Sequence, residues 1–223
     1  MYSLKESEKV KNYLKIGLAV AALFVMGSGI ANAQVHSLST DVLAPAKVDV
    51  SFVLNNAATQ DSTQLLVRAG VTKNVEALVG QGYGQGQTYL GVKVNLLGGD
   101  TSYKLVAGIY QYSTRGEQVT PYVLGSWSLG KNFTAFGGGI AFSGRFEPNF
   151  GVDYTPVTKF GKNSVVKSLR YRAEYQGNGN EYLVLSATAV TTRTTEFTVG
   201  LNDRNPTRSM QFYPYVGVTF HVK

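Results

Sequence analysis

Apolar and polar residues alternate along the chain from about residue 46 onward, and a period of two residues is the period of a β-strand. No stretch of this region keeps the period of an amphipathic helix. Short polar or Gly-rich stretches interrupt the alternation and divide it into twelve candidate strands. We expect these strands at 46–55, 63–72, 75–82, 88–97, 101–112, 118–130, 133–143, 146–157, 165–176, 181–190, 195–202 and 209–222.

The connections between these strands alternate in character. Tight turns, in which Asn or Gly accepts a left-handed backbone, are expected at Lys73-Asn74, Gly98-Gly99-Asp100, Lys131-Asn132 and Gly161-Lys162-Asn163. More polar connections are expected at 56–62, 83–87, 113–117, 177–180 and 203–208. Sequential hairpins with tight links on one side and looser links on the other indicate an antiparallel up-and-down barrel. We expect ten to twelve strands, with twelve favoured, and an even number returns both chain ends to one side.

Charged residues share one face of the predicted strands, and apolar residues share the other. In 165–176, for example, Leu169 and Tyr171 alternate with Arg170 and Arg172. The charged face of the strands carries Asp49, Arg68, Glu76, Lys93, Lys104, Glu147, Asp153, Arg170, Arg172, Glu174 and Glu196. The apolar face includes Leu90, Val92, Val94, Leu169, Tyr171, Val216, Val218 and Phe220.

Alternation alone fits two arrangements. In a soluble periplasmic or secreted β-barrel, the apolar side chains fill the interior, where they could bind a small apolar ligand. In a transmembrane barrel the apolar side chains face lipid and the charged ones face the lumen. The soluble arrangement stays open as the alternative.

Three features favour the transmembrane arrangement. Strands of about 10 residues suit a tilted membrane crossing. Aromatic residues near strand ends, which suit the membrane interfaces, are Phe133, Tyr154, Tyr175, Phe197 and Phe220. Small residues on the charged face, which leave room inside a narrow barrel, include Gly70, Gly80, Gly91, Gly108, Gly151 and Gly200. The sequence therefore predicts an all-β, antiparallel, up-and-down transmembrane β-barrel.

With this arrangement, residues 34–223 resemble Gram-negative outer-membrane β-barrel proteins, the group of small porins and structural barrels. The final strand of that group alternates apolar residues up to an aromatic, and the matching residues here are Phe212, Val216, Val218 and Phe220. The chain departs from the pattern by continuing past this aromatic to Lys223. The resemblance implies a location in the outer membrane, recognition by the barrel assembly machinery and contact with outer-membrane lipid. It also implies a narrow porin-like channel or a structural, surface-interaction barrel.

The N-terminal residues have the pattern of a secretory signal. Lysines precede an apolar run at 16–26, and small residues then lead to Ala31-Asn32-Ala33, which predicts cleavage before Gln34. The apolar run is well short of the roughly 20 residues that a spanning helix needs. We therefore expect a signal peptide at 1–33, a periplasmic segment at 34–45 and the barrel at 46–223.

Composition narrows the chemistry. The net charge of +7 over 223 residues is dispersed along the chain, which argues against a nucleic-acid partner. There is no cysteine, so neither a disulfide nor a lipid-modified cysteine is available. His36 lies near the predicted cleavage site and His221 at a strand end, and both are expected on the surface. Because catalysis and metal binding need convergent groups, we predict no catalytic site, metal site or cofactor; an outer-membrane lipid-modifying enzyme stays a third alternative.

The predicted lumen has five positive and six negative side chains, close to balance. A dedicated ion channel lines its constriction with one sign of charge, so pairing across a narrow interior is favoured. The alternative is a basic ladder of Arg170 and Arg172 that guides small anions. In the external connections, candidates for contact with lipopolysaccharide phosphates are Arg115, Arg145, Arg204 and Arg208.

Overall fold

The protein is described here from a computed structural model. The described residues are 39–57, 60–83, 88–97, 102–112, 118–142, 145–158, 160–161, 164–177, 181–192, 194–204 and 211–222. They form twelve strands: β1 (Val48–Ala57), β2 (Gln60–Gly70), β3 (Val75–Tyr83), β4 (Thr88–Leu97), β5 (Tyr103–Tyr112), β6 (Gln118–Ser128), β7 (Phe133–Phe142), β8 (Arg145–Tyr154), β9 (Ser168–Gly177), β10 (Glu181–Thr192), β11 (Thr195–Arg204) and β12 (Phe212–Val222). Among the described residues, no helix is long and apolar enough to cross a membrane.

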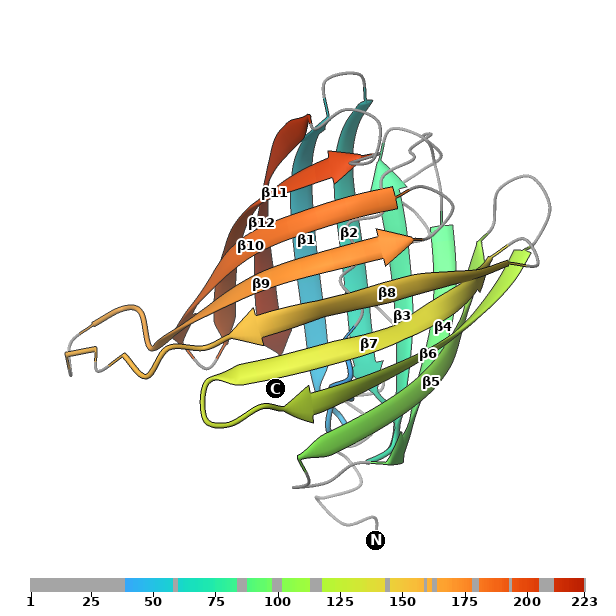
Figure 1. The fold of residues 1–223 in the computed structure, drawn as a ribbon, viewed down its shortest axis with the longest axis horizontal. Helices are drawn as coiled ribbons and strands as arrows, with labels where there is room; N and C mark the ends of the chain where they lie inside the picture. The colour runs from blue at the N-terminus through green and yellow to red at the C-terminus, as the bar shows by residue number, and fades with distance from the viewer. Residues whose placement is uncertain are drawn as a thin grey trace, which may run out of the picture.

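Each strand pairs antiparallel with the next, and β12 pairs with β1 to close the ring (Figure 1). The closing register runs from Val48 opposite Val222 to Asn55 opposite Tyr215. A closed ring has no free edge strand. β1 begins and β12 ends at the same end of the barrel, here called the terminal rim. The predicted all-β, antiparallel, twelve-stranded barrel is confirmed.

Two connections differ in length from the prediction. The Ser164 N–H donates to the Gly161 carbonyl at 2.8 Å, which fits the turn expected at 161–163, but β8 ends at Tyr154 and β9 begins at Ser168, so the connection between these strands is longer than expected. In Figure 1 this connection projects sideways from the barrel wall at the terminal rim. Pro156 has no backbone N–H, which opposes continuation of a strand there. At the opposite rim, Ala57 pairs with Gln60, so the predicted loop 56–62 is instead a tight hairpin.

The outer wall is largely apolar. Exposed side chains such as Leu90 (49%) and Phe150 (53%) alternate along their strands with inward-facing polar ones. On β1 to β3 the same wall carries a packed cluster of Val48, Leu65, Val67 and Val79. The soluble alternative places Leu90, Val92 and Tyr171 around an internal cavity; all three are instead exposed outside, so that placement is wrong.

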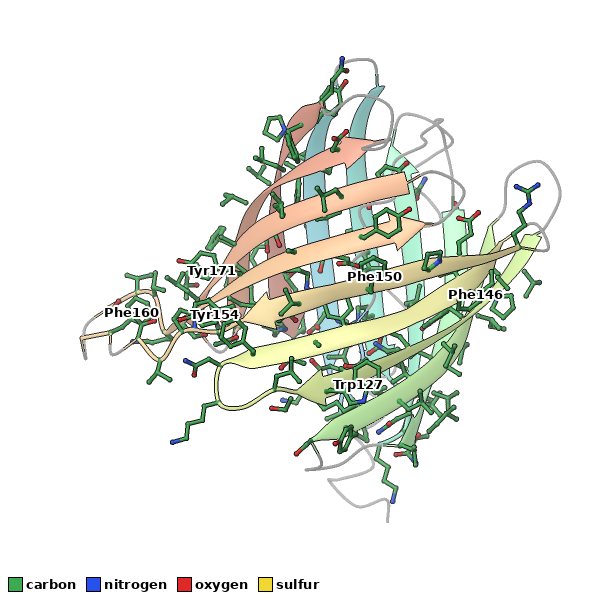
Figure 2. All side chains as sticks on the ribbon, in the orientation of Figure 1. Trp127, Phe146, Phe150, Tyr154, Phe160 and Tyr171 are labelled. Carbon is green, nitrogen blue, oxygen red and sulfur yellow. The ribbon has the colours of Figure 1, made fainter. Side chains whose placement is uncertain are left out.

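Aromatic side chains gather on the outer wall toward the terminal rim. The ring centroids of Phe133 and Tyr154 are 4.6 Å apart, and those of Tyr154 and Tyr171 are 6.3 Å apart. Figure 2 shows Tyr154 and Tyr171 beside one another, with Phe160 of the 155–167 connection beyond them. Such a band is typical of a barrel surface at a membrane interface.

Part of the interior is apolar, which the sequence did not predict. Inward side chains of β5, β6 and β7 form a buried cluster of Val106, Tyr122, Leu124, Phe136 and Ile140. These strands therefore carry apolar residues on both faces. Two inward glycines make room for the aromatic rings, since a Cβ on Gly108 would lie 2.4 Å from the Tyr122 ring and one on Gly151 would lie 2.5 Å from Phe136. The cluster fills one side of the barrel and leaves the polar side open.

Candidate functional site: the charged lumen

Ionised side chains line the inner wall, most of them in the half nearer the terminal rim. We call this set the charge belt; its members are Asp49, Arg68, Glu76, Lys93, Lys104, Asp153, Arg170, Arg172, Glu174, Glu196 and His221. The strand register sets acids directly opposite bases. The opposed pairs are Asp49 with Arg68, Asp49 with His221, Glu76 with Lys93, and Asp153 with Arg172. Cross-strand opposition brings such side chains within contact distance.

Glu76 is the centre of the first group of charges. Its carboxylate is fully buried. Arg68 donates from Nε to Oε1 at 2.9 Å and from Nη2 to Oε2 at 2.8 Å, and Lys93 Nζ lies 3.1 Å from Oε1. The backbone N–H of Leu43 donates to Oε2 at 2.9 Å. These contacts occupy the acceptor capacity of the carboxylate and compensate for its loss of water.

Arg172 is the centre of the second group. Its guanidinium donates to both carboxylate oxygens of Asp153, at 2.6 and 2.7 Å, which is the strong bidentate geometry. Its Nη1 lies 3.6 Å from Glu174, and its Cζ lies 4.8 Å from the centre of the Phe136 ring. Arg172 therefore joins the charge belt to the apolar cluster through a cation–π contact.

His221 bridges two carboxylates. Its Nδ1 lies 2.6 Å from Asp49 and its Nε2 lies 3.2 Å from Glu196. Arg170 Nη2 approaches the second oxygen of Glu196 at 3.6 Å. An imidazolium, which has a donor on each nitrogen, satisfies both carboxylates at once.

This arrangement corrects the prediction that His221 is a surface residue. Its side chain faces inward and is 30% exposed. The inward position of His221 could have been predicted from the sequence. His221 lies an even number of residues from the inward-facing Tyr215 and Thr219 on the same strand, so all three share one face. The two carboxylates contact opposite ring nitrogens and do not converge on one point. No group of three possible metal ligands occurs among the residues with described placement.

The segment before β1 lies against the inner wall. Of the segment 34–45, which we expect on the periplasmic side, the structure describes residues 39–45, and residues 39–43 contact side chains of the lumen. Lys93 Nζ donates to the Asp41 carbonyl at 2.5 Å, and Lys104 Nζ donates to the Asp41 carboxylate at 2.5 Å. Thr40 and Ser126 hydroxyls lie 2.9 Å apart. The inward-facing cations stabilise this position of the segment, because they donate hydrogen bonds to its carbonyl groups.

The charges around Asp41 determine its protonation. Partial burial raises the pKa of the Asp41 carboxyl, but the hydrogen bond and charge of Lys104 and the charges of Lys93 and Arg68 outweigh burial. Together they hold that pKa below its usual value. Asp41 is therefore a carboxylate throughout the neutral pH range.

A cavity of about 350 Å³ lies inside the barrel beside this segment. Its lining consists mainly of charged and hydroxyl-bearing side chains, with some apolar ones among them. Among its lining residues are Arg68, Arg170, Glu196, Thr198, Tyr215 and His221. The volume is that of a site for water or a small solute.

The structure places the predicted charged-face residues on the inner wall. Of these, Asp49, Glu76, Lys93 and Glu174 are buried. The partly exposed ones are Arg68, Lys104, Glu147, Asp153, Arg170, Arg172 and Glu196. Glu147 lies nearer the opposite rim and apart from the charge belt.

The predicted apolar-face residues lie on the outer wall. Those exposed are Leu90, Val92, Tyr171, Val216 and Phe220, and those half-buried are Val94, Leu169 and Val218. Arg145 is exposed at the start of β8. The predicted cleavage residues Ala31, Ala33 and Gln34, the histidine at 36 and the loop arginines 115 and 208 lie outside the described residues. The contributions of Asp41 and the neighbouring segment were missed.

Solved structures share this architecture. The KdgM porin matches with a TM-score of 0.57 at 13% identity, over 79% of this chain and 99% of that chain. The barrel resembles porins in fold. A KdgM porin in complex with disordered oligogalacturonate matches with a TM-score of 0.58 at 12% identity, and the NanC porin with 0.53 at 14%, each with the same coverage. No protein-family model and no curated protein sequence matches the chain.

Proposed function

We propose that this chain is a narrow, porin-like channel of the outer membrane without catalytic activity. The observation that carries the proposal is a closed ring whose outer wall is apolar and whose inner wall holds paired charges around a cavity. The apolar outer wall is suited to contact with lipid, and the charged inner wall is suited to contact with water. The strands, of 9 to 12 residues, have the length of a tilted crossing.

The pairing of charges in the lumen is an argument for weak ion selectivity of the channel. Each of the five predicted luminal cations lies within 3.7 Å of a carboxylate, so the described part of the lumen has no ring of unpaired charge of one sign. One similar structure is of a KdgM porin with oligogalacturonate, an acidic oligosaccharide. Because the cations here are internally neutralised, we propose small neutral or weakly charged solutes for this channel.

Single-channel recording in planar bilayers tests the proposal. The mature chain is first shown to be folded by its heat-modifiable gel mobility in detergent. We then expect discrete conductance steps with a reversal potential near zero in a salt gradient. A folded barrel that produces no steps would support a structural or surface-interaction role in place of the channel.

A further inference from the structure

Residues 39–45, here called the strap, follow a course around the inner wall from β2 to β6. Ala46 N–H donates to the Gly70 carbonyl of β2, and the strap then reaches Glu76 of β3 through Leu43. Asp41 meets the lysines of β4 and β5, and Thr40 reaches Ser126 of β6. The strap therefore crosses five strands, β2 to β6, on the side of the lumen opposite β9 to β12.

The chain enters β1 through a backbone conformation that directs the strap inward. Ala46 has a φ of 62°, in the left-handed region that non-glycine residues rarely adopt. The neighbouring bonds, from Ala46 N–H to Gly70 and from Gly70 N–H to the Lys47 carbonyl, fix this bend. Gly70 is also the point of closest approach, because a Cβ there would lie 2.1 Å from the Ala44 carbonyl oxygen.

The strap supplies hydrogen-bond acceptors to cations of the inner wall, two of which, Arg68 and Lys93, border the cavity. Lys93 donates to carbonyl oxygens of Ser39 and Asp41, Arg68 donates to the Asp41 carbonyl, and Lys104 pairs with the Asp41 carboxylate. One side chain of the strap, Val42, packs on the apolar cluster of the lumen. The attachment is thus mainly polar, and water or a solute anion could replace these contacts.

We propose that the strap is a built-in obstruction that regulates the channel by narrowing the lumen and neutralising the cations of β2, β4 and β5. This inference rests on the proposed channel function. When the strap is in place, the open path is the cavity beside it. When it withdraws, the path widens and Arg68, Lys93 and Lys104 lose the acceptors that the strap supplies. Withdrawal also removes the Asp41 carboxylate, so the channel becomes more selective for anions.

The G70A variant displaces the strap without changing any charge. The added methyl conflicts with backbone atoms of Ala44 and Leu43, so the strap must move. Its matched control is G217A, also on the inner wall, where the nearest atom to the new Cβ would be 3.4 Å away. A chain lacking residues 34–43 provides a second test if the barrel does not tolerate G70A. Heat-modifiable mobility checks the fold of each variant.

The double variant T40C/S126C locks the strap instead. The two hydroxyl oxygens lie 2.9 Å apart, and the chain has no cysteine of its own, so oxidation can join only this pair. The oxidised and reduced forms are then compared in the same preparation. The locked form gives the conductance with the strap held in place.

We expect G70A and the shortened chain to conduct roughly twofold or more above wild type, with a reversal potential shifted toward anions, because the constriction sets both quantities. G217A and oxidised T40C/S126C should not exceed wild type. If wild type conducts and neither G70A nor the shortened chain differs from G217A, the strap proposal is overturned while the channel stands. If every folded variant is silent, both are overturned.

Discussion

Neutralising Glu76 tests whether the charge belt is held together as described. The E76Q variant keeps the size of the side chain but removes the charge that faces Arg68 and Lys93. Removing one member of a buried ion pair typically costs 3–5 kcal/mol, because the remaining charge is left without compensation. Here Arg68 also has Asp49 at 3.7 Å, and Lys93 also donates to the Asp41 carbonyl. These remaining partners place the expected loss of unfolding free energy near the lower limit, at about 3 kcal/mol.

The assay is urea unfolding of the barrel in lipid vesicles, followed by the fraction with heat-modifiable gel mobility. The control is E147Q, the same substitution at a partly exposed inward position outside the charge belt, for which we expect a loss of less than about 1 kcal/mol. The K93M variant removes one of the two cations, and the bidentate Arg68 contact with Glu76 remains. The double variant E76Q/K93M should therefore lose less than the sum of the single losses.

Two results would refute the reasoning. One is a loss for E76Q no larger than that for E147Q, which would mean that water in the lumen screens the whole group. The other is strict additivity of E76Q and K93M, which would mean that the 3.1 Å contact between Glu76 and Lys93 contributes no coupling.

Three further predictions follow from other parts of the barrel. Trp127, the only tryptophan, is 42% exposed on the outer wall, so brominated lipid should quench its fluorescence, and quenching equal to that of free tryptophan in the buffer would contradict the lipid-facing assignment. R172M removes one luminal cation and should shift the reversal potential toward cations, opposite in sign to E76Q; a shift of the same sign would exclude direct electrostatic control. Because the pKa of Asp41 is lowered by Lys104, Lys93 and Arg68 despite burial, the contribution of its charge to strap attachment is complete above pH 3.8 and is lost as pH falls below that value. The difference in conductance between wild type and D41N should thus be constant from pH 6 to 5, and a change within that range would contradict the prediction.

The strand periodicity was sufficient to predict the ring and the inner position of the charges, because each face of a strand is decided by neighbours two residues away. The length of the connection between β8 and β9 was not foreseen: the turn expected at Gly161 is present, but β8 ends and β9 begins several residues away from it. The apolar cluster at Leu124 and Phe136 was also missed. Alternation contrasts polar with apolar residues, and it carries no signal where both faces are apolar.

The strap could not be predicted, because nothing local distinguishes residues 39–45 from an extended periplasmic segment. Its position depends on donors that are distant in the sequence, at Arg68, Lys93 and Lys104. The strap supplies acceptors to these cations, namely the Asp41 carboxylate and the carbonyl oxygens of Ser39 and Asp41.

The charge belt also explains why the register of this barrel is well specified. A slip of one residue moves every side chain of a strand to the other face. For β9 such a slip would place Arg170, Arg172 and Glu174 against lipid and would break the bidentate contact with Asp153. Charged side chains on the lipid face cost a few kcal/mol each near the membrane centre, so the slipped ring is strongly disfavoured. The paired charges to which we attribute weak selectivity in the proposed channel are therefore the same charges that favour this pairing of the strands around the lumen.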